Sequence, residues 1–359
     1  FEVQAYDLSA PSLTANGLTI AAKASIGPQT LLVDGQAKLR GARANGQVHE
    51  AQQALAGLAA APVIGPLARQ LAQAVARTGP GVEGAAGFSL TQQQGQMGVA
   101  LSDIRLAAGR GGFVAWPGKA VVLYDAAGLS LAGAARFGGV GFPAGRAQFA
   151  GRRAEIVMAP YRAPGAEARF TPISLWWTGK GIGVATQVVL NGPLGRGRIK
   201  GLTIPLRLQP GQMMPQGCFP LRFQSAYVSA ARIGPTRLTS CSNGQDIWLA
   251  APELRGKWGQ APLRFRAAEA RFSPQRRTGF VRSLGLHWGQ GQDASYLQVA
   301  ELTSQPRRTG FGGQIMGLEG QLANIPLHIR QMAGQWQTGR AGLDVMGSAM
   351  LSDGTSDPR

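Results

Sequence analysis

The sequence is poor in the residue types on which most active sites depend. It has three histidines, His49, His287 and His328, which stand far apart, and its 18 carboxylates form no catalytic pair that the sequence reveals. No lysine precedes Ser or Thr, and the patterns G-x-S-x-G, H-E-x-x-H and C-x-x-C do not occur. One G-x-G-x-x-G occurs at Gly79 to Gly84, but it follows a predicted helix and precedes a strand, the reverse of the dinucleotide-binding context, so we interpret it as a turn. Acyl transfer and metal-dependent hydrolysis lack candidate residues. We expect a protein that is not an enzyme and that holds neither a metal nor a cofactor.

Charged residues are also scarce, at 15% of the 359 residues. Because 36 Lys and Arg face only 18 Asp and Glu, the net charge is +18. Such a surplus suits anionic partners, for example phospholipid headgroups, lipopolysaccharide or nucleic acid. The basic residues form no run longer than a pair, however, and no nucleic-acid-binding motif is present. Arginines scattered over solvated strand faces are the favoured interpretation, and we expect no nucleic-acid partner.

A long hydrophobic run is missing too. No apolar stretch approaches the roughly 18 residues of a transmembrane helix, and no signal peptide is visible. The chain begins at Phe1 rather than Met, and it stops at Arg359 soon after a strand-like pattern at Met346 to Met350. We expect an internal piece of a longer protein, whose membrane anchor lies outside residues 1–359.

Cysteine is limited to Cys218 and Cys241, and their spacing fits no metal site. Cys218 begins one predicted strand, and Cys241 ends the antiparallel strand that returns beside it. A disulfide is the favoured interpretation, with a stabilisation of about 3 to 4 kcal/mol. It would place the protein in an oxidising compartment such as the periplasm. Two unrelated buried thiols are the alternative.

Glycine and proline are abundant, and they separate short alternating segments. The 52 Gly and 22 Pro make up about a fifth of the chain, against an average of roughly 12%, while 44% of the residues are hydrophobic. Asn16-Gly17, Asp34-Gly35 and Asn45-Gly46 are typical of tight hairpin turns. We predict a mainly β fold, in which an elongated, curved antiparallel sheet forms a groove.

The clearest alternation of apolar and polar residues lies within Ile199–Leu249. Two alternating strands, one through Leu202 to Leu208 and one through Leu221 to Tyr227, precede the Gly234-Pro235 turn and a return strand from Thr236 to Cys241. Together they predict a disulfide-pinned meander over residues 199–249. A one-residue shift of register would turn the apolar set to the other face. Nine side chains are expected to line the apolar groove: Leu202, Ile204, Leu206, Leu208, Leu221, Phe223, Tyr227, Phe265 and Phe272.

One segment departs from the strand pattern. Residues 47–77 are rich in alanine and other helix formers, with a break at Pro62 and a second helix start at Gly65-Pro66. The second helix has an apolar face that includes Leu67 and Ala74. An ordinary covering helix is the favoured interpretation, and a cap over the apolar groove is the alternative.

A five-residue motif recurs in the last third of the chain. Arg276-Arg277-Thr278-Gly279-Phe280 returns as Arg307-Arg308-Thr309-Gly310-Phe311 after 31 residues. The recurrence suits a sheet built from similar hairpins, although chance in an Arg- and Gly-rich chain explains it equally well.

Several stretches are similar to the YdbH-type branch of the AsmA-like proteins, which resemble bridge-like lipid transfer proteins. The stretches that carry the resemblance are Gly57–Val75, Phe88–Leu106, Gly201–Leu208, Gly217–Phe223 and Ile233–Leu238. The resemblance implies an elongated β-sheet groove in the periplasm, anchored in the inner membrane, that carries phospholipid toward the outer membrane and serves outer-membrane biogenesis. It also implies an outer-membrane lipoprotein as a possible partner, and it supplies no catalytic residue.

Two other functions remain open. One is a structural or adhesive β-solenoid or sandwich whose apolar face is a dry core, although a regular repeat along the whole chain is not visible. The other, which ranks last, is binding of a polyanion through the arginines.

Overall fold

The structure is a computed structural model of the whole chain. It describes residues 1–10, 13–28, 30–44, 47–59, 61–77, 81–93, 96–109, 111–125, 128–212, 214–291, 294–307, 310–323, 328–338 and 343–352.

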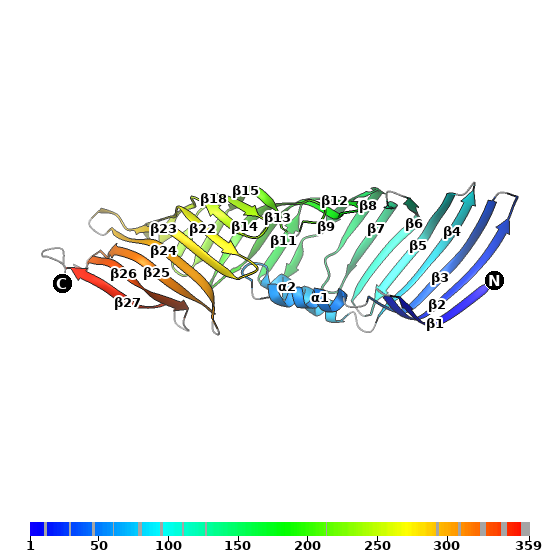
Figure 1. The fold of residues 1–359 in the computed structure, drawn as a ribbon, viewed down its shortest axis with the longest axis horizontal. Coiled ribbons are helices and arrows are strands. Elements are labelled where there is room, and N and C mark those ends of the chain that lie inside the picture. Colours follow the sequence, from blue (N-terminus) through cyan, green and yellow to red (C-terminus); the bar gives the residue numbers. More distant parts are fainter. Residues whose placement is uncertain are drawn as a thin grey trace. The chain divides into compact units, whose positions relative to one another are not determined.

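The chain is mainly β, and its described residues form 27 strands and two helices (Figure 1). Each strand pairing in the described part of the chain is antiparallel. The chain divides into unit 1, Phe1–Pro193 with Leu206–Gly211, and unit 2, Leu194–Pro205 with Gln212–Arg359. The predicted mainly β, antiparallel fold is confirmed. The curvature of the sheet into a groove stays a prediction.

Unit 1 is a meander in which β1 to β9 pair in chain order. Beyond β9, the strand β12 pairs with β9 and β13, and β13 also pairs with β11, the partner of β10. The strands are β1 Glu2–Ala10, β2 Leu13–Ile26, β3 Thr30–Ala44, β4 Val82–Gln93, β5 Gln96–Ala108, β6 Gly112–Asp125, β7 Gly128–Gly139, β8 Gly145–Gly151, β9 Arg153–Met158, β10 Tyr161–Ala163, β11 Ala166–Phe170, β12 Ile173–Thr178 and β13 Gly181–Leu194.

Unit 2 begins with two series of short paired strands and ends as a meander of long ones. Both series start from β14 and end at β23. In one, β14 is followed by β16, β17, β20 and β21; in the other, by β15, β18, β19 and β22. The strands are β14 Gly197–Leu208, β15 Gln216–Phe223, β16 Ser225–Val228, β17 Ala231–Ile233, β18 Thr236–Asn243, β19 Ile247–Ala250, β20 Glu253–Trp258, β21 Ala261–Arg266, β22 Glu269–Ser273, β23 Thr278–Trp288, β24 Ser295–Arg307, β25 Gly310–Gln321, β26 His328–Thr338 and β27 Leu343–Ser352.

Two of the predicted hairpin turns are wrong. Asn16-Gly17 lies inside β2 and Asp34-Gly35 inside β3, while β2 ends at Ile26 and β3 begins at Thr30. Close packing explains the second glycine, because a Cβ on Gly35 would lie 2.8 Å from the Phe88 ring on β4. The third predicted turn, Asn45-Gly46, lies outside the described residues.

The sheets have little of the packed core that a globular domain has. The buried apolar residues are mostly alanines. The chain exposes 22258 Å² of surface, whereas two compact proteins that share its 37.5 kDa equally would expose roughly 16,500 Å². Much of the large apolar side chain area therefore stays at the surface.

The predicted helical segment is confirmed as α1, Gln47–Leu58, and α2, Gly65–Arg77. Helix α2 contacts β10 and β11 at strand ends of unit 1 and lies below β11 in Figure 1. The Gln70 side chain donates to the Arg162 carbonyl at 2.6 Å, and the buried Ala74 packs at the turn after β7, where a Cβ on Gly141 would lie 3.1 Å away. These contacts make α2 a covering helix at the strand ends. The alternative of a cap over the apolar face stays a prediction.

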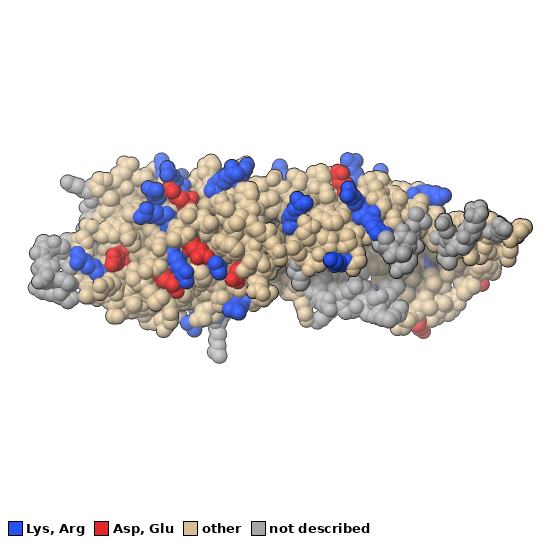
Figure 2. Space-filling model, turned by 45° about the horizontal axis from the view of Figure 1, so that its top comes forward, with Lys and Arg blue, Asp and Glu red and all other residues tan. Residues whose placement is uncertain are grey.

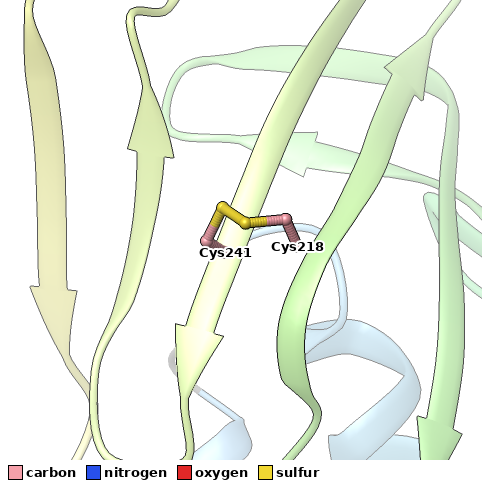
Figure 3. Close-up of a disulfide and its surroundings, with 2 residues drawn as sticks. All are labelled: Cys218 and Cys241. Carbon is pink, nitrogen blue, oxygen red and sulfur yellow. A yellow bond between two sulfur atoms is a disulfide. The ribbon is translucent and has the colours of Figure 1, made fainter.

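The predicted disulfide between Cys218 and Cys241 is confirmed (Figure 3). The two residues are register partners on β15 and β18, with their Cα atoms 3.9 Å apart. The predicted return strand from Thr236 is β18. The short strands β16 and β17 lie between β15 and β18 in sequence, so the bond pins two strands that are not joined by a simple hairpin.

We expect the double variant Cys218→Ser/Cys241→Ser to lose about 3 kcal/mol of unfolding free energy, because the bond closes a loop across a sequence separation of 23. Denaturant unfolding measures the loss. Reductant should lower the stability of the wild-type chain by a similar amount and leave the double variant unchanged. Equal midpoints for oxidised wild type and double variant would contradict the expectation.

Candidate functional site

One face of the unit 1 sheet is apolar across many neighbouring strands. Residues in cross-strand register share a face, so the pairings trace rows of side chains across the sheet. One row crosses seven strands: Ala5, Leu18, Leu39, Gly84, Leu106, Val114 and Phe137. A second row on the same face crosses six strands: Ala24, Val33, Leu90, Val99, Val122 and Leu131.

Bulges keep this face apolar where the alternation in the sequence shifts by one residue. Leu101 and Leu106 are an odd number of residues apart on β5, yet their partners on β4, Phe88 and Gly84, are an even number apart. The extra residue on β5 is accommodated near Asp103, whose φ is 49°. Without the bulge, one half of the strand would turn its leucine toward the polar face.

An aromatic cluster lies on the same apolar face. The Trp116 ring stacks on Phe149 with centroids 4.6 Å apart, and Phe149 lies 6.4 Å from Trp177. Trp177 is register partner of Ile182, whereas the adjacent Trp176 is partner of Arg153 and points to the other face. The cluster thus extends the apolar face across β6, β8 and β12.

An apolar cavity of about 420 Å³ opens at one end of these strands. Its size is within the range of sites that hold small apolar ligands. The side chains that line it come from β4 to β7 and the turn after β7, and include Val82, Leu106, Phe113, Val114, Phe137 and Phe142.

Unit 2 has an apolar face of its own. One row contains Ile199, Ala226, Ile233, Gly256, Leu263 and Trp288. A second row contains Leu254, Phe265, Leu286 and Leu297, and a third contains Leu249, Ala270, Val281, Leu302 and Ile315. As in unit 1, a bulge keeps apolar side chains on one face where their spacing in the sequence changes. On β25, Ile315 and Leu318 are three residues apart, whereas their partners on β26 are two apart.

Six of the nine side chains predicted from sequence have register partners that suit an apolar face. Thr203 pairs with Arg222, so Leu202 and Ile204 share the opposite face with Leu221 and Phe223. These four are half-buried, as are Leu206 and Leu208 on the part of β14 that belongs to unit 1. Phe265 pairs with Leu254 and Leu286, and Phe272, which is 44% exposed, pairs with Ile247 and Gly279.

Tyr227 does not share this face. It is exposed, and its register partners are Arg198 and Arg232, which places it on the polar side. The expected single strand from Leu221 to Tyr227 breaks at Gln224, opposite Gly201, which has φ 66°. The break shifts the alternation by one residue, so that Ala226 is the buried neighbour of Ile199.

The polar faces carry the arginines, partly in ion pairs. Figure 2 shows basic side chains spread over the visible face with fewer acidic ones among them. Hydrogen bonds from Arg162 and Arg169 hold the pKa of Glu167 below its ordinary value, and Arg255 lowers the pKa of Glu253 in the same way. Burial raises the pKa of Tyr161, whose hydroxyl donates to the Gly141 carbonyl at 2.8 Å.

The sequence interpretation missed most of the apolar face of unit 1, including Trp116 and Phe149. One sequence feature could have revealed it. In Leu101-Ser102-Asp103-Ile104, two apolar residues are three positions apart with an Asp between them, and this spacing marks a bulge within a strand, not the end of the strand.

Among the described residues, no three His, Cys, Asp or Glu side chains are grouped so that they could hold a metal ion. None of the helices in the described ranges is long and apolar enough to cross a membrane. No protein family, curated protein or solved structure matches the chain.

We expect Asp103→Val to lower the unfolding free energy by about 1 to 2 kcal/mol, because a β-branched residue disfavours the positive φ of the bulge. Asp103→Gly should stay near wild type, since glycine adopts this φ freely, although it too loses the carboxylate that accepts from the Gly118 N–H. Urea unfolding measures both. An equal loss in the two variants would mean that the hydrogen bond, not the bulge, matters.

Proposed function

We propose that the chain is a non-enzymatic carrier of phospholipid, whose acyl chains lie on the apolar faces of the two units. The observation that carries the proposal is the register itself. In each unit, several cross-strand rows of Leu, Val, Ile and Phe side chains lie on the same face. Most of these large side chains keep part of their surface exposed. Apolar area of this extent needs an occupant in water.

Acyl chains are a suitable occupant of such a face. Burial of each methylene contributes about 0.8 kcal/mol, and the binding needs no polar partner along the chain. The phosphate headgroups would remain at the rim in water, near arginines of the polar faces. The apolar cavity beside Phe137 and Phe142 is a place where one acyl chain end would fit.

The resemblance to the YdbH-type branch of AsmA-like proteins supports the same function. On this proposal the protein works in the periplasm, is anchored in the inner membrane by a segment outside these residues, and passes phospholipid toward the outer membrane. An outer-membrane lipoprotein is a proposed partner. The Cys218–Cys241 disulfide agrees with an oxidising compartment.

We expect purified protein to carry phospholipid that mass spectrometry of an organic extract detects. The double variant Leu90→Asp/Ile204→Asp should lose most of this lipid, because a carboxylate on the apolar face is costly to cover with acyl chains. The matched control Ser89→Asp/Thr203→Asp adds the same charges to the adjacent, opposite-facing positions and should keep the lipid.

Lipid-free wild-type protein with a stable fold would instead support a structural or adhesive β protein with a dry interior. An equal loss of lipid from the control variant would show that added charge, and not the apolar face, determines retention.

A further inference from the structure

Both copies of the repeated Arg-Arg-Thr-Gly-Phe motif belong to unit 2. The first copy begins in the turn between β22 and β23, and the second begins at Arg307, the last residue of β24. Because Gly279 at the start of β23 pairs with Ser304 near the end of β24, both copies lie at the same end of these strands. Arg308 and Thr309 fall outside the described residues.

The leading arginine of each copy, Arg276 and Arg307, lines one cavity of about 530 Å³. The cavity belongs to the polar face, since Arg271, Phe280 and Thr303 form one of its register rows, and the Gln314 N–H donates to the Thr303 hydroxyl at 2.9 Å. Hydroxyl and amide side chains make up much of the remaining wall: Ser273, Thr303, Ser304, Gln305, Gln314 and Gln335.

The third arginine of the cavity is already neutralised and held in place. Arg271 lies 2.8 Å from a Glu269 carboxylate oxygen and 3.8 Å from one of Asp246. Its guanidinium carbon is also 5.2 Å from the centre of the Trp248 ring and 5.6 Å from that of Phe280. Arg271 therefore shapes the floor of the cavity without contributing net charge.

The charge that remains is positive. Arg271 is shared by Asp246 and Glu269, and Arg282 lies 3.6 Å from Glu301. Together with Arg276 and Arg307, four arginines thus face three carboxylates, which leaves a net charge of +1 around the cavity. No described residue forms an ion pair with Arg276 or Arg307. The cavity thus offers two unpaired guanidinium groups next to a wall of hydrogen-bonding side chains.

We propose that this cavity binds a phosphomonoester carried by a hydroxylated molecule, such as a sugar phosphate. A phosphomonoester bears a charge of about −1.5 to −2 at neutral pH, which matches two guanidinium groups, and arginine recognises phosphate oxygens with a planar fork of donors. The serine, threonine and glutamine side chains would bind the hydroxyls. The ligand's source is either a free sugar phosphate or the phosphorylated sugar headgroup of a glycolipid. The site lies on the polar face of unit 2, so it is independent of the proposed apolar lipid site.

Calorimetric titration of the purified 359-residue chain tests the proposal with glucose 6-phosphate, glucose and inorganic phosphate as probes. We expect glucose 6-phosphate to bind, inorganic phosphate to bind more weakly and glucose not to bind. Arg276→Gln and Arg307→Gln should each weaken glucose 6-phosphate binding about tenfold, the loss of one charged hydrogen-bonding group. Arg277→Gln is the matched control, because Arg277 belongs to the same turn but does not line the cavity.

A flotation assay with phosphatidylcholine vesicles, with and without a glycolipid that carries a sugar phosphate, distinguishes the two sources. Binding to the glycolipid vesicles that Arg276→Gln weakens, with no binding of free glucose 6-phosphate, would support the site and assign the lipid source. Binding of neither probe would overturn the proposal. So would an equal loss in Arg277→Gln, since it would mean that net charge alone attracts the ligand. Melting temperatures of the variants, all at exposed arginines, confirm that each remains folded.

Discussion

The structure depends on cross-strand register in sheets that bury little on their own. In a strand, neighbouring side chains point to opposite faces, so one slipped residue would move a whole apolar set into water or onto the charged side. Bulges near Asp103 on β5 and between Ile315 and Leu318 on β25 correct such slips. Their effect is that apolar side chains from many strands stay in line, although the buried positions are mostly filled by alanine.

The two faces of each sheet therefore differ in chemistry. The apolar side binds ligands through dispersion contacts and the burial of apolar surface. It therefore distinguishes ligands mainly by their hydrophobicity. The polar side holds arginines in defined surroundings, some neutralised by carboxylates, as Arg271 is by Glu269, and others free of ion pairs within the described part of the chain, as Arg276 is. The proposed lipid site and the proposed phosphate site follow from this division.

The sequence predicted the mainly β class, the helical segment and the disulfide, because each rests on a local pattern or on a pair of residues. Its failures came where long-range pairing overrides local preference. Asn16-Gly17 has the composition of a hairpin turn but lies within β2, and Tyr227 continues the alternation of Phe223 in sequence but not in space. The strand break at Gln224 determines which face of the sheet Tyr227 lies on. The alternation of residues in the sequence does not reveal this break. The division into two units was also beyond the local patterns.

The most direct test of the account is photo-crosslinking at two aromatic positions of unit 2. A benzophenone amino acid replaces Phe265 on the apolar face in one variant and Tyr227 on the polar face in the other. After irradiation of cells that express each variant, mass spectrometry measures the phospholipid attached to the purified protein. The account predicts phospholipid adducts at position 265 and none at position 227. Adducts at neither position, or equally at both, would contradict it.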